Sequence, residues 1–308
     1  MVKSFFKKVT GISKVNLYLK EELEKMKVLM SQPMVQHIRQ LKSPVKSFAE
    51  IEFSAFSQWG DDGIIQYLIE KLPLKNKSFI EFGVSNYFEA NTRFLLLNNN
   101  WRGLVLDGSK ENIKLIEEDT ISWRYDLTAR HLFITKDNIN EAIQGAGFEK
   151  EIGVLHIDLD GNDYWIWECI EGIDPEIVIM EYNSVFGNSG AISVPYDDSF
   201  FVTNAHFSNL FFGASLKALC YLAEKKGYSF VGSNLHGNNA YFVKNNLLNE
   251  WVQPISADDG FVACNFRQNR DNEGNLTLKR DSEMIKQCGD LLVVDVTNKQ
   301  TSPLKFYL

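Results

Sequence analysis

The stretch Gly153–Ser184, GVLHIDLDGNDYWIWECIEGIDPEIVIMEYNS, decides the fold of this chain. Two short apolar runs, Val154–Ile157 and Ile177–Met180, flank an amphipathic segment at Asp163–Ile173. Short runs rich in Val and Ile on either side of a helix are typical of neighbouring, buried parallel strands. We therefore predict a strand, a helix and a second strand within an α/β sheet.

Polar side chains follow both apolar runs, where each predicted strand ends. They are Asp158, Asp160, Asn162 and Asp163 after the first run, and Glu181, Tyr182 and Asn183 after the second. In open α/β sheets ligands bind outside the carboxyl ends of the strands, so we expect the functional site among these carboxylates and amides. His156 lies inside the first run and is either a catalytic base or a buried, hydrogen-bonded histidine.

Length and composition exclude several classes of protein. The 308 residues suffice for one large domain with extensions or for two small domains. A net charge of −8 without a central basic block argues against a nucleic-acid partner, because phosphate neutralisation supplies most of that affinity. The four cysteines are far apart and form no CxxC, which favours reduced thiols and a cytoplasmic protein. No apolar run is long enough to cross a bilayer.

Residues 1–50 are predicted to form a helical extension. Leu19, Leu23, Met26 and Met30 follow a heptad-like spacing, which indicates either packing on the chain's own domain or a contact in a homo-oligomer. The basic start of the chain lacks a continuous apolar region, so we do not predict a signal peptide. Its lysines are either solvated or in peripheral contact with an anionic membrane.

The next segments predict a β-α-β-α order. Asp61 or Asp62 is expected to cap a helix that runs to Leu72. Ser78–Val84 and Trp101–Asp107 are predicted strands, each followed by a helix. An acid at the end of the second strand either holds the ribose hydroxyls of a nucleoside or caps the next helix.

A third strand is predicted at His131–Thr135, and Phe186–Phe201 is interpreted as a long loop. Ala214–Lys226 is a predicted helix, and two alternating strands follow it at Tyr228–Ser233 and Asn239–Lys244. A doubly wound, mostly parallel seven-stranded sheet that ends in an antiparallel hairpin is the arrangement of class I S-adenosylmethionine-dependent methyltransferases. We expect this Rossmann-like domain at residues 51–248, with residues 249–308 packed on it as a C-terminal extension.

Several motifs together resemble the FkbM-type methyltransferase family, in the branch associated with bacterial surface-polysaccharide genes. The motifs are SQWGDDGI, FIEFGV, LVLDGS, HIDLDGNDYWIWE, IVIMEYN, KGYSFVGSN with GNNAYFV, and NFRQNRDNEGNL near the C-terminus. The family's glycine-rich loop is reduced here to Gly83–Asn86.

The resemblance implies a function and a set of site residues. It implies an S-adenosylmethionine-dependent O-methyltransferase acting on a hydroxyl of a sugar, nucleotide sugar or glycan. The residues expected at the cofactor are Glu81, Gly83, Val84, Ser85, Asp107, Gly108, Asp137 and Asn138. Those expected at the acceptor are Gln58, Asp61, Asn162, Glu181 and Asn183, with Asp158, Asp160 or His156 as catalytic residues.

A divalent ion is also implied, because related sugar methyltransferases hold one with carboxylates at strand ends. Asp158, Asp160 and Glu181 offer the hard oxygen ligands that suit Mg²⁺, which would lower the pKa of the acceptor hydroxyl. The alternative is that one aspartate caps the Asn162 turn while the other is solvated.

Rival functions remain open from the sequence. DLDGN resembles the nucleophile motif of haloacid-dehalogenase-type phosphatases, but three predicted strands precede it here. The same triplet resembles the metal motif of nucleotide-sugar glycosyltransferases. A third alternative is a non-catalytic descendant that binds a glycan or partner in the same cleft.

Overall fold

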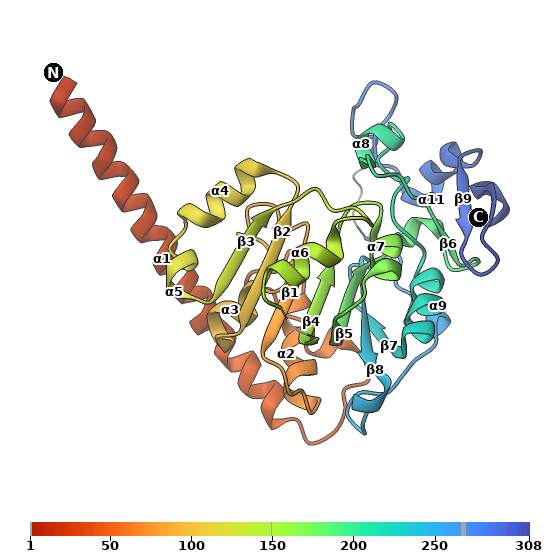
Figure 1. Ribbon diagram of the computed structural model, residues 1–308, viewed down its shortest axis with the longest axis horizontal. Helices are drawn as coiled ribbons and strands as arrows, with labels where there is room; N and C mark the ends of the chain where they lie inside the picture. The colour runs from red at the N-terminus through yellow and green to blue at the C-terminus, as the bar shows by residue number, and fades with distance from the viewer. Residues whose placement is uncertain (1, 149, 266–268) are drawn as a thin grey trace.

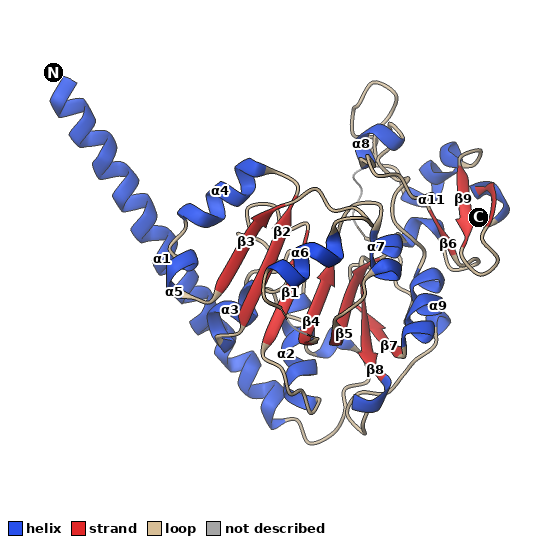
Figure 2. Ribbon diagram, in the orientation of Figure 1, coloured by secondary structure: helices blue, strands red, loops and turns tan. Residues whose placement is uncertain are grey.

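The computed structural model of the chain describes residues 2–148, 150–265 and 269–308, with side chains from Tyr18 onward. Residues 266–268 of the NFRQNRDNEGNL motif lie outside this description. The central feature is a seven-stranded sheet of order β3-β2-β1-β4-β5-β8-β7 (Figures 1 and 2). Its strands are β1 (Ser78–Phe82), β2 (Arg102–Asp107), β3 (Leu127–His131), β4 (Glu151–Ile157), β5 (Asp174–Glu181), β7 (Tyr228–Ser233) and β8 (Asn239–Lys244).

The strand directions confirm the predicted class I methyltransferase fold. Strands β1 to β5 pair in parallel, whereas β8 runs antiparallel to both β5 and β7. The apolar residues of β4 and β5 are buried on both faces, as expected for the centre of a sheet covered on both sides. The order of β1 to β5 reverses between β1 and β4, so a crevice is expected at their carboxyl ends.

Two layers of helices cover the sheet, and each layer packs on one set of alternating strand residues. Ile80 and Leu155 belong to one face, and Phe79 and Val154 to the other. The first face carries α6 (Ile139–Gly145), α7 (Asp163–Cys169) and α9 (Leu216–Lys226). The second carries α2 (Asp61–Lys71), α3 (Arg93–Asn99), α4 (Lys110–Glu118) and α5 (Ile121–Arg124).

The N-terminal extension is one helix, α1 (Val2–Gln40), whose first half projects beyond the body (Figure 1). Val35 and Ile38 near its end are buried against the second helical layer and its neighbours. Leu23 and the other residues of the heptad-like spacing are instead exposed. The helical extension is therefore confirmed, but the spacing does not mark the face that packs on the chain's own domain.

A small second sheet of order β10-β9-β6 lies beside α9 and was not predicted (Figure 2). The predicted loop at Phe186–Phe201 contributes its first strand, β6 (Ile192–Ser193), and the C-terminal region contributes β9 (Leu292–Asp295) and β10 (Gln300–Pro303). The remaining short helices are η1 (Phe48–Glu50), η2 (Ser184–Phe186), α8 (Val202–Ala205), η3 (Asn245–Leu247), α10 (Ala257–Gly260), α11 (Asp281–Met284), η4 (Ile285–Cys288) and η5 (Leu304–Phe306).

Two local predictions were wrong. The third strand begins at Leu127 and ends at His131, so most of the predicted His131–Thr135 strand is a loop after it. The residue that caps α2 is Gly60, which makes no side-chain cap. Asp62 in the first turn instead accepts hydrogen bonds from the backbone N–H groups of residues 55–57, at 2.7, 2.7 and 2.9 Å.

In the part of the chain that the structure describes, no helix is both long enough and apolar enough to traverse a bilayer.

Candidate functional site

The carboxyl ends of β1 and β4 lie in direct contact, and Gly83 makes this possible. Gly83 has φ of +72°, and a Cβ added there would lie 1.7 Å from the backbone oxygen of Asp158. Only glycine fits this approach, because it has no Cβ and readily adopts positive φ. The crevice between β1 and β4 is therefore fixed by backbone against backbone.

A cavity of about 390 Å³ opens at this crevice. It brings together many of the residues that the sequence predicted at the cofactor and the acceptor. These are Gly83, Ser85, Asp107, Gly108, Asp158, Asp160 and Asn162. The cavity therefore runs from the end of β2 to the loop after β4, within one shared hollow.

Asp107 is held rigidly at the end of β2. One carboxylate oxygen accepts the backbone N–H of Ser85 at 2.7 Å, and the other accepts the N–H of Ser109 at 2.8 Å and the amide of Asn112 at 3.0 Å. The helix cap of α4 is the Ser109 hydroxyl and not Asp107. The carboxylate thus connects the β1 and β2 loops at the cavity wall.

Asp137 and Asn138 are not among the residues that line the cavity. The Asn138 amide donates to the carbonyl of Phe133 at 2.9 Å, and its oxygen accepts the N–H of Thr135 at 2.9 Å, so its side chain holds the loop after β3. The wall is formed instead by residues 132–134 and 200–202. The rings of Phe133 and Phe201 pack against each other there, with 5.3 Å between centroids.

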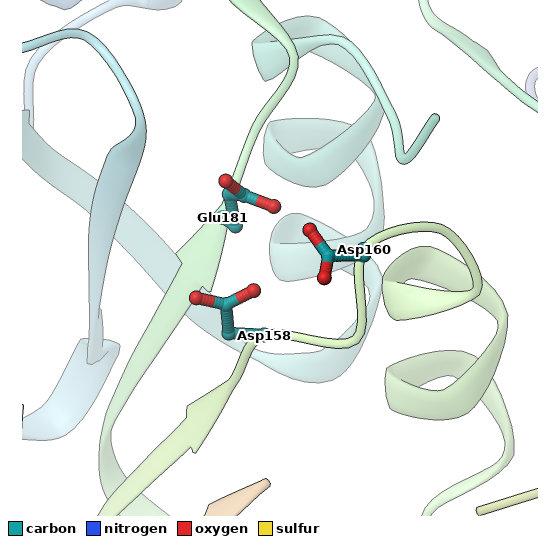
Figure 3. A group of neighbouring side chains, drawn as sticks. All are labelled: Asp158, Asp160 and Glu181. Atoms are coloured by element: carbon teal, nitrogen blue, oxygen red, sulfur yellow. The ribbon is translucent and has the colours of Figure 1, made fainter. Parts of the chain in front are cut away.

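Three carboxylates converge at the ends of β4 and β5 (Figure 3). Asp158 ends β4, Asp160 lies in the following loop, and Glu181 is the last residue of β5. One oxygen from each lies within 4.8 Å of the others, and Oε2 of Glu181 has no hydrogen-bond partner among the described residues. All three ligands predicted for a divalent ion are therefore brought together.

The electrostatics of these three carboxylates favour the binding of a cation. Burial and the charge of Asp160 raise the pKa of Asp158 from its usual 3.8 to about 8. Burial, followed by the charges of Asp158 and Asp160, raises the pKa of Glu181 well above its usual range. Such carboxyl groups are ionised together only when a positive charge neutralises them.

The loop that carries Asp160 is held by Asp163. Its carboxylate accepts the backbone N–H of Leu159 at 2.7 Å and of Gly161 at 2.9 Å. Asp160 itself has φ of +52°, a conformation that few residues other than Gly, Asn and Asp adopt. Asp163, rather than Asp158 or Asp160, therefore stabilises the turn, so the alternative of a capping role for those two residues is not supported.

A second cavity of about 120 Å³ adjoins the first and shares Gly83 and Asp158 with it. It collects further predicted site residues, namely Gln58, Asp61, Glu81, Val84 and His156.

Glu81 and His156 form a buried pair across neighbouring strands. Nδ1 of His156 lies 2.8 Å from Oε1 of Glu81, and Nε2 lies 3.1 Å from the amide nitrogen of Asn91. Burial disfavours the charge on each, but their hydrogen bond and mutual attraction outweigh it, so the pKa of Glu81 is lowered and the pKa of His156 is raised. Both ring nitrogens are occupied, which fits a buried, hydrogen-bonded histidine better than a base.

Asp61 is fully buried at the wall of the second cavity. Its Oδ1 accepts from the amides of Asn234 at 3.1 Å and Asn239 at 3.0 Å and from the hydroxyl of Tyr241. Its Oδ2 has no partner among the described residues. A buried acceptor without a donor is costly unless a ligand supplies one.

Two predicted acceptor residues hold the backbone instead. Asn183 lines neither cavity, and its amide donates to the carbonyls of Leu210 at 2.8 Å and Phe212 at 3.0 Å. The amide of Asn162 donates to the carbonyl of Asp197 at 2.8 Å, although Asn162 still lines the first cavity. Asn162 therefore connects the β4 loop with the loop that ends at Phe201.

Some site residues were not predicted. The rings of Trp59 and His236 stack with centroids 3.9 Å apart, and Asn238 and Asn239 line the second cavity beside Trp59. Trp59 and the two asparagines lie within two motifs of the family resemblance, SQWGDDGI and GNNAYFV. Their place in these motifs is the sequence signal that could have identified them as site residues. The position of the two asparagines depends on the pairing of β5 with β8, which local patterns do not specify.

Comparison with solved structures finds distant likenesses among methyltransferases. The O-methyltransferase from Bacillus cereus in complex with SAH is 11% identical with a TM-score of 0.41, over 71% of this chain and 91% of that chain. A SAM-dependent methyltransferase from Clostridium acetobutylicum is 12% identical with a TM-score of 0.35, over 60% of this chain and 90% of that one. The chain covers 54% of the DszA carbon methyltransferase, at 11% identity and a TM-score of 0.37.

No protein-family model matches the chain, and no curated protein matches it.

Proposed function

We propose that this chain is an S-adenosylmethionine-dependent O-methyltransferase of the FkbM type, acting on a hydroxyl of a sugar or glycan in surface-polysaccharide synthesis. The observation that carries the proposal is the 390 Å³ cavity, which joins the Asp107 carboxylate to Asp158 and Asp160 at the switch point of a class I methyltransferase sheet. Free thiols at all four cysteines support the proposed cytoplasmic location.

In the proposed complex the nucleoside of the cofactor lies in this cavity. The fixed Asp107 carboxylate accepts hydrogen bonds from the ribose hydroxyls. The aromatic ring of Phe133 and the side chain of Ile134 provide an apolar wall for adenine, in place of the predicted Asp137 and Asn138. The sulfonium end faces Gly83 and the backbone of the two residues after it, next to the second cavity.

A divalent ion fits the carboxylate group of Asp158, Asp160 and Glu181. The unpartnered Oε2 of Glu181 and the raised pKa values show a site in which negative charge is not neutralised by the protein. All the atoms available to coordinate the metal are carboxylate oxygens, the ligands that Mg²⁺ prefers. When bound, such an ion supplies Lewis acidity that lowers the pKa of a hydroxyl.

The chemistry that the chain's own residues perform is positioning and proton transfer. The methyl group forms a bond with the acceptor oxygen as its bond to sulfur breaks, so the two cavities must hold donor and acceptor in line. The hydroxyl proton passes to a carboxylate, which we assign to Asp160 because it is exposed in the loop beside the cavity. His156 has a structural role in this proposed mechanism, because both of its ring nitrogens already form hydrogen bonds.

The second cavity supports a sugar acceptor. Asp61, Asn238 and Asn239 present carboxylate and amide groups, which are typical partners of sugar hydroxyls. The stacked Trp59 and His236 offer an aromatic surface beside them, against which the apolar face of a sugar ring can pack.

Calorimetry tests the proposal against its main rival. S-adenosylmethionine and a UDP-sugar are titrated separately into the full chain, with and without Mg²⁺. Heat with the methyl donor is expected. Heat with the nucleotide sugar alone would instead indicate a glycosyltransferase, and heat with neither would indicate a binding protein without this activity.

An Asp160→Asn variant tests the catalytic assignment. The rate at which the acceptor hydroxyl is methylated should fall, since the base is lost, while the affinity for S-adenosylmethionine should change little. Asp198→Asn, which changes an exposed aspartate two positions before Phe200 of the cavity wall, is the matched control and should keep the wild-type rate. A wild-type rate in Asp160→Asn would remove this residue from the catalytic machinery.

A further inference from the structure

One face of α1 carries a continuous row of exposed apolar side chains. Leu19, Leu23, Met26 and Met30 are 52%, 59%, 54% and 73% exposed, and no part of the described chain covers them. We infer that this row, called here the α1 seam, is the contact of a parallel two-stranded coiled coil with α1 of a second copy of the chain.

The sequence continues the seam at heptad spacing to the start of the helix. Placing Leu23 at position a puts Leu19 and Met26 at position d, and the same register extends toward the N-terminus. The further a and d positions are Val2, Phe5, Val9, Ile12 and Asn16, all within the described helix Val2–Gln40. The a and d pattern thus extends over four heptads. A helix that contacts only solvent on this face does not require such a pattern.

The seam and the face that packs on the body are different faces of α1. Glu24 forms an ion pair with the buried Arg93 at 2.7 Å, while Val28 packs against the body and Ser31 is buried. With about 3.6 residues per turn, this face lies roughly a third of a turn from the seam. A second α1 can therefore occupy the seam while the first remains attached to its own body.

The charges beside the seam complement each other in a parallel pair. Glu22 is at position g and Lys27 is at the following position e, so each Glu22 would face Lys27 of the other copy. In the single chain Glu22 pairs with Lys25 of its own helix at 2.7 Å, on the solvent side. In the sequence, Asn16 falls at a central position a, and a single asparagine at such a position specifies the register and number of strands of a coiled coil.

The charge pattern also argues for a protein partner over an anionic membrane. The acidic Glu22 lies beside the seam at position g, and an anionic surface would repel it. The seam ends at the point where α1 begins to be buried against the body. Pro33 falls on its next d position, and Val35 and Ile38 after it are buried against the body.

Light scattering on the full chain tests the inference. The wild type should show twice the chain mass of 35.3 kDa over a dilution series, and Leu23→Asp should show the single mass with an unchanged circular dichroism spectrum. Leu276→Asp, at a leucine that is 52% exposed against 59% for Leu23 but far along the chain, is the control and should remain dimeric. A monomeric wild type, or a Leu23→Asp variant that stays dimeric, would overturn the proposal.

Cysteine crosslinking tests the direction and register. None of the four native cysteines lies in α1, so Met26→Cys places a single thiol at position d. In a parallel, in-register pair the two thiols meet and form a disulfide between chains under mild oxidation. Lys25→Cys, at an outward position, is the control. Equal crosslinking of the two variants would contradict the seam.

A vesicle experiment distinguishes a second copy of α1 from a membrane surface as the partner of the seam. Flotation with vesicles containing phosphatidylserine should leave the wild-type chain unbound at physiological salt. Flotation of a monomeric chain, lost in Leu23→Asp, would assign the seam to a membrane surface and reject the dimer.

Discussion

Asp107 has two tasks at the scale of a single residue, because its carboxylate both holds two loops and faces the cavity. We predict that Asp107→Ala weakens S-adenosylmethionine binding by about 1–3 kcal/mol, the usual cost of losing hydrogen bonds to a charged group. Calorimetric titration measures this change. Asp126→Ala, an exposed aspartate before β3, controls for net charge and should bind normally. Unchanged affinity in a folded Asp107→Ala protein would reject the ribose assignment.

The carboxylate group makes stability depend on pH and on divalent ions. The pKa of Asp158 is raised in the folded chain from 3.8 to about 8, so the folded state favours the protonated form. This contribution to stability is complete below the unfolded pKa and is lost as pH rises through about 8. We therefore predict that the metal-free chain loses melting temperature over this range and that Mg²⁺ restores more of it at the alkaline end.

Thermal unfolding in EDTA and in Mg²⁺ across this pH range measures the effect. Asp158→Asn is the informative variant, because it removes the titrating group while keeping its shape. It should flatten the pH dependence in EDTA and lose most of the stabilisation by Mg²⁺. Equal stabilisation of wild type and variant at every pH would show that the ion binds elsewhere.

The pair of Glu81 and His156 shows why single residues were the hardest part to predict. The sequence placed an acid and a histidine in two apolar runs, and left His156 open between a base and a structural residue. Only the parallel pairing of β1 with β4 sets Glu81 opposite His156, 75 positions away. The contacts of Asn183 could not be predicted for the same reason, since its carbonyl partners lie in a loop without a sequence pattern.

At the scale of elements, the contact between the ends of β1 and β4 should be intolerant of any side chain. Gly83→Ala places a Cβ against the Asp158 carbonyl and adds backbone strain, so we predict a loss of at least about 1–3 kcal/mol in unfolding free energy and a loss of cofactor binding. Gly274→Ala separates the two causes, because Gly274 also has positive φ but nothing within 4 Å of the added Cβ.

Chemical denaturation of both variants measures the difference. Gly274→Ala should show the strain alone and bind the cofactor normally. If both variants lost the same amount of stability, the close approach of the two strands would contribute nothing.

Elements with a strong local pattern were predicted well. The hairpin strands Tyr228–Ser233 and Asn239–Lys244 were predicted to the residue, because alternation and a short connection both mark them. The third strand was shifted, because the apolar sequence HLFIT looked more strand-like than LTARH, a half-exposed strand at the sheet edge. The small sheet was missed, because β6 has two residues and pairs with a strand about a hundred positions later.

At the scale of the whole molecule, the C-terminal sheet and the part of the first cavity's wall at Phe200 share one apolar cluster. Leu304 and Val293 pack there with Phe186, and Phe200 beside the cavity packs against the same group. This cluster indicates that the C-terminal extension predicted at residues 249–308 supports the site.

We predict that Leu304→Ala costs about 2–5 kcal/mol in unfolding free energy, the usual range for removing a buried leucine, and raises the KM for S-adenosylmethionine. Leu308→Ala, at a half-exposed leucine four positions later, should change neither quantity. Denaturant unfolding and steady-state kinetics measure both. A destabilised Leu304→Ala enzyme with an unchanged KM would separate the C-terminal sheet from cofactor binding.

The projecting first half of α1 bears on how the molecule meets a long substrate. In the proposed dimer, the two chains joined along this rod would carry their bodies at the same end. A polymer with regularly repeated hydroxyls that is engaged by one body is then presented to the other at a high effective concentration, so avidity rather than single-site affinity would govern its residence time. Short oligosaccharides, which cannot bridge the two bodies, would escape this gain.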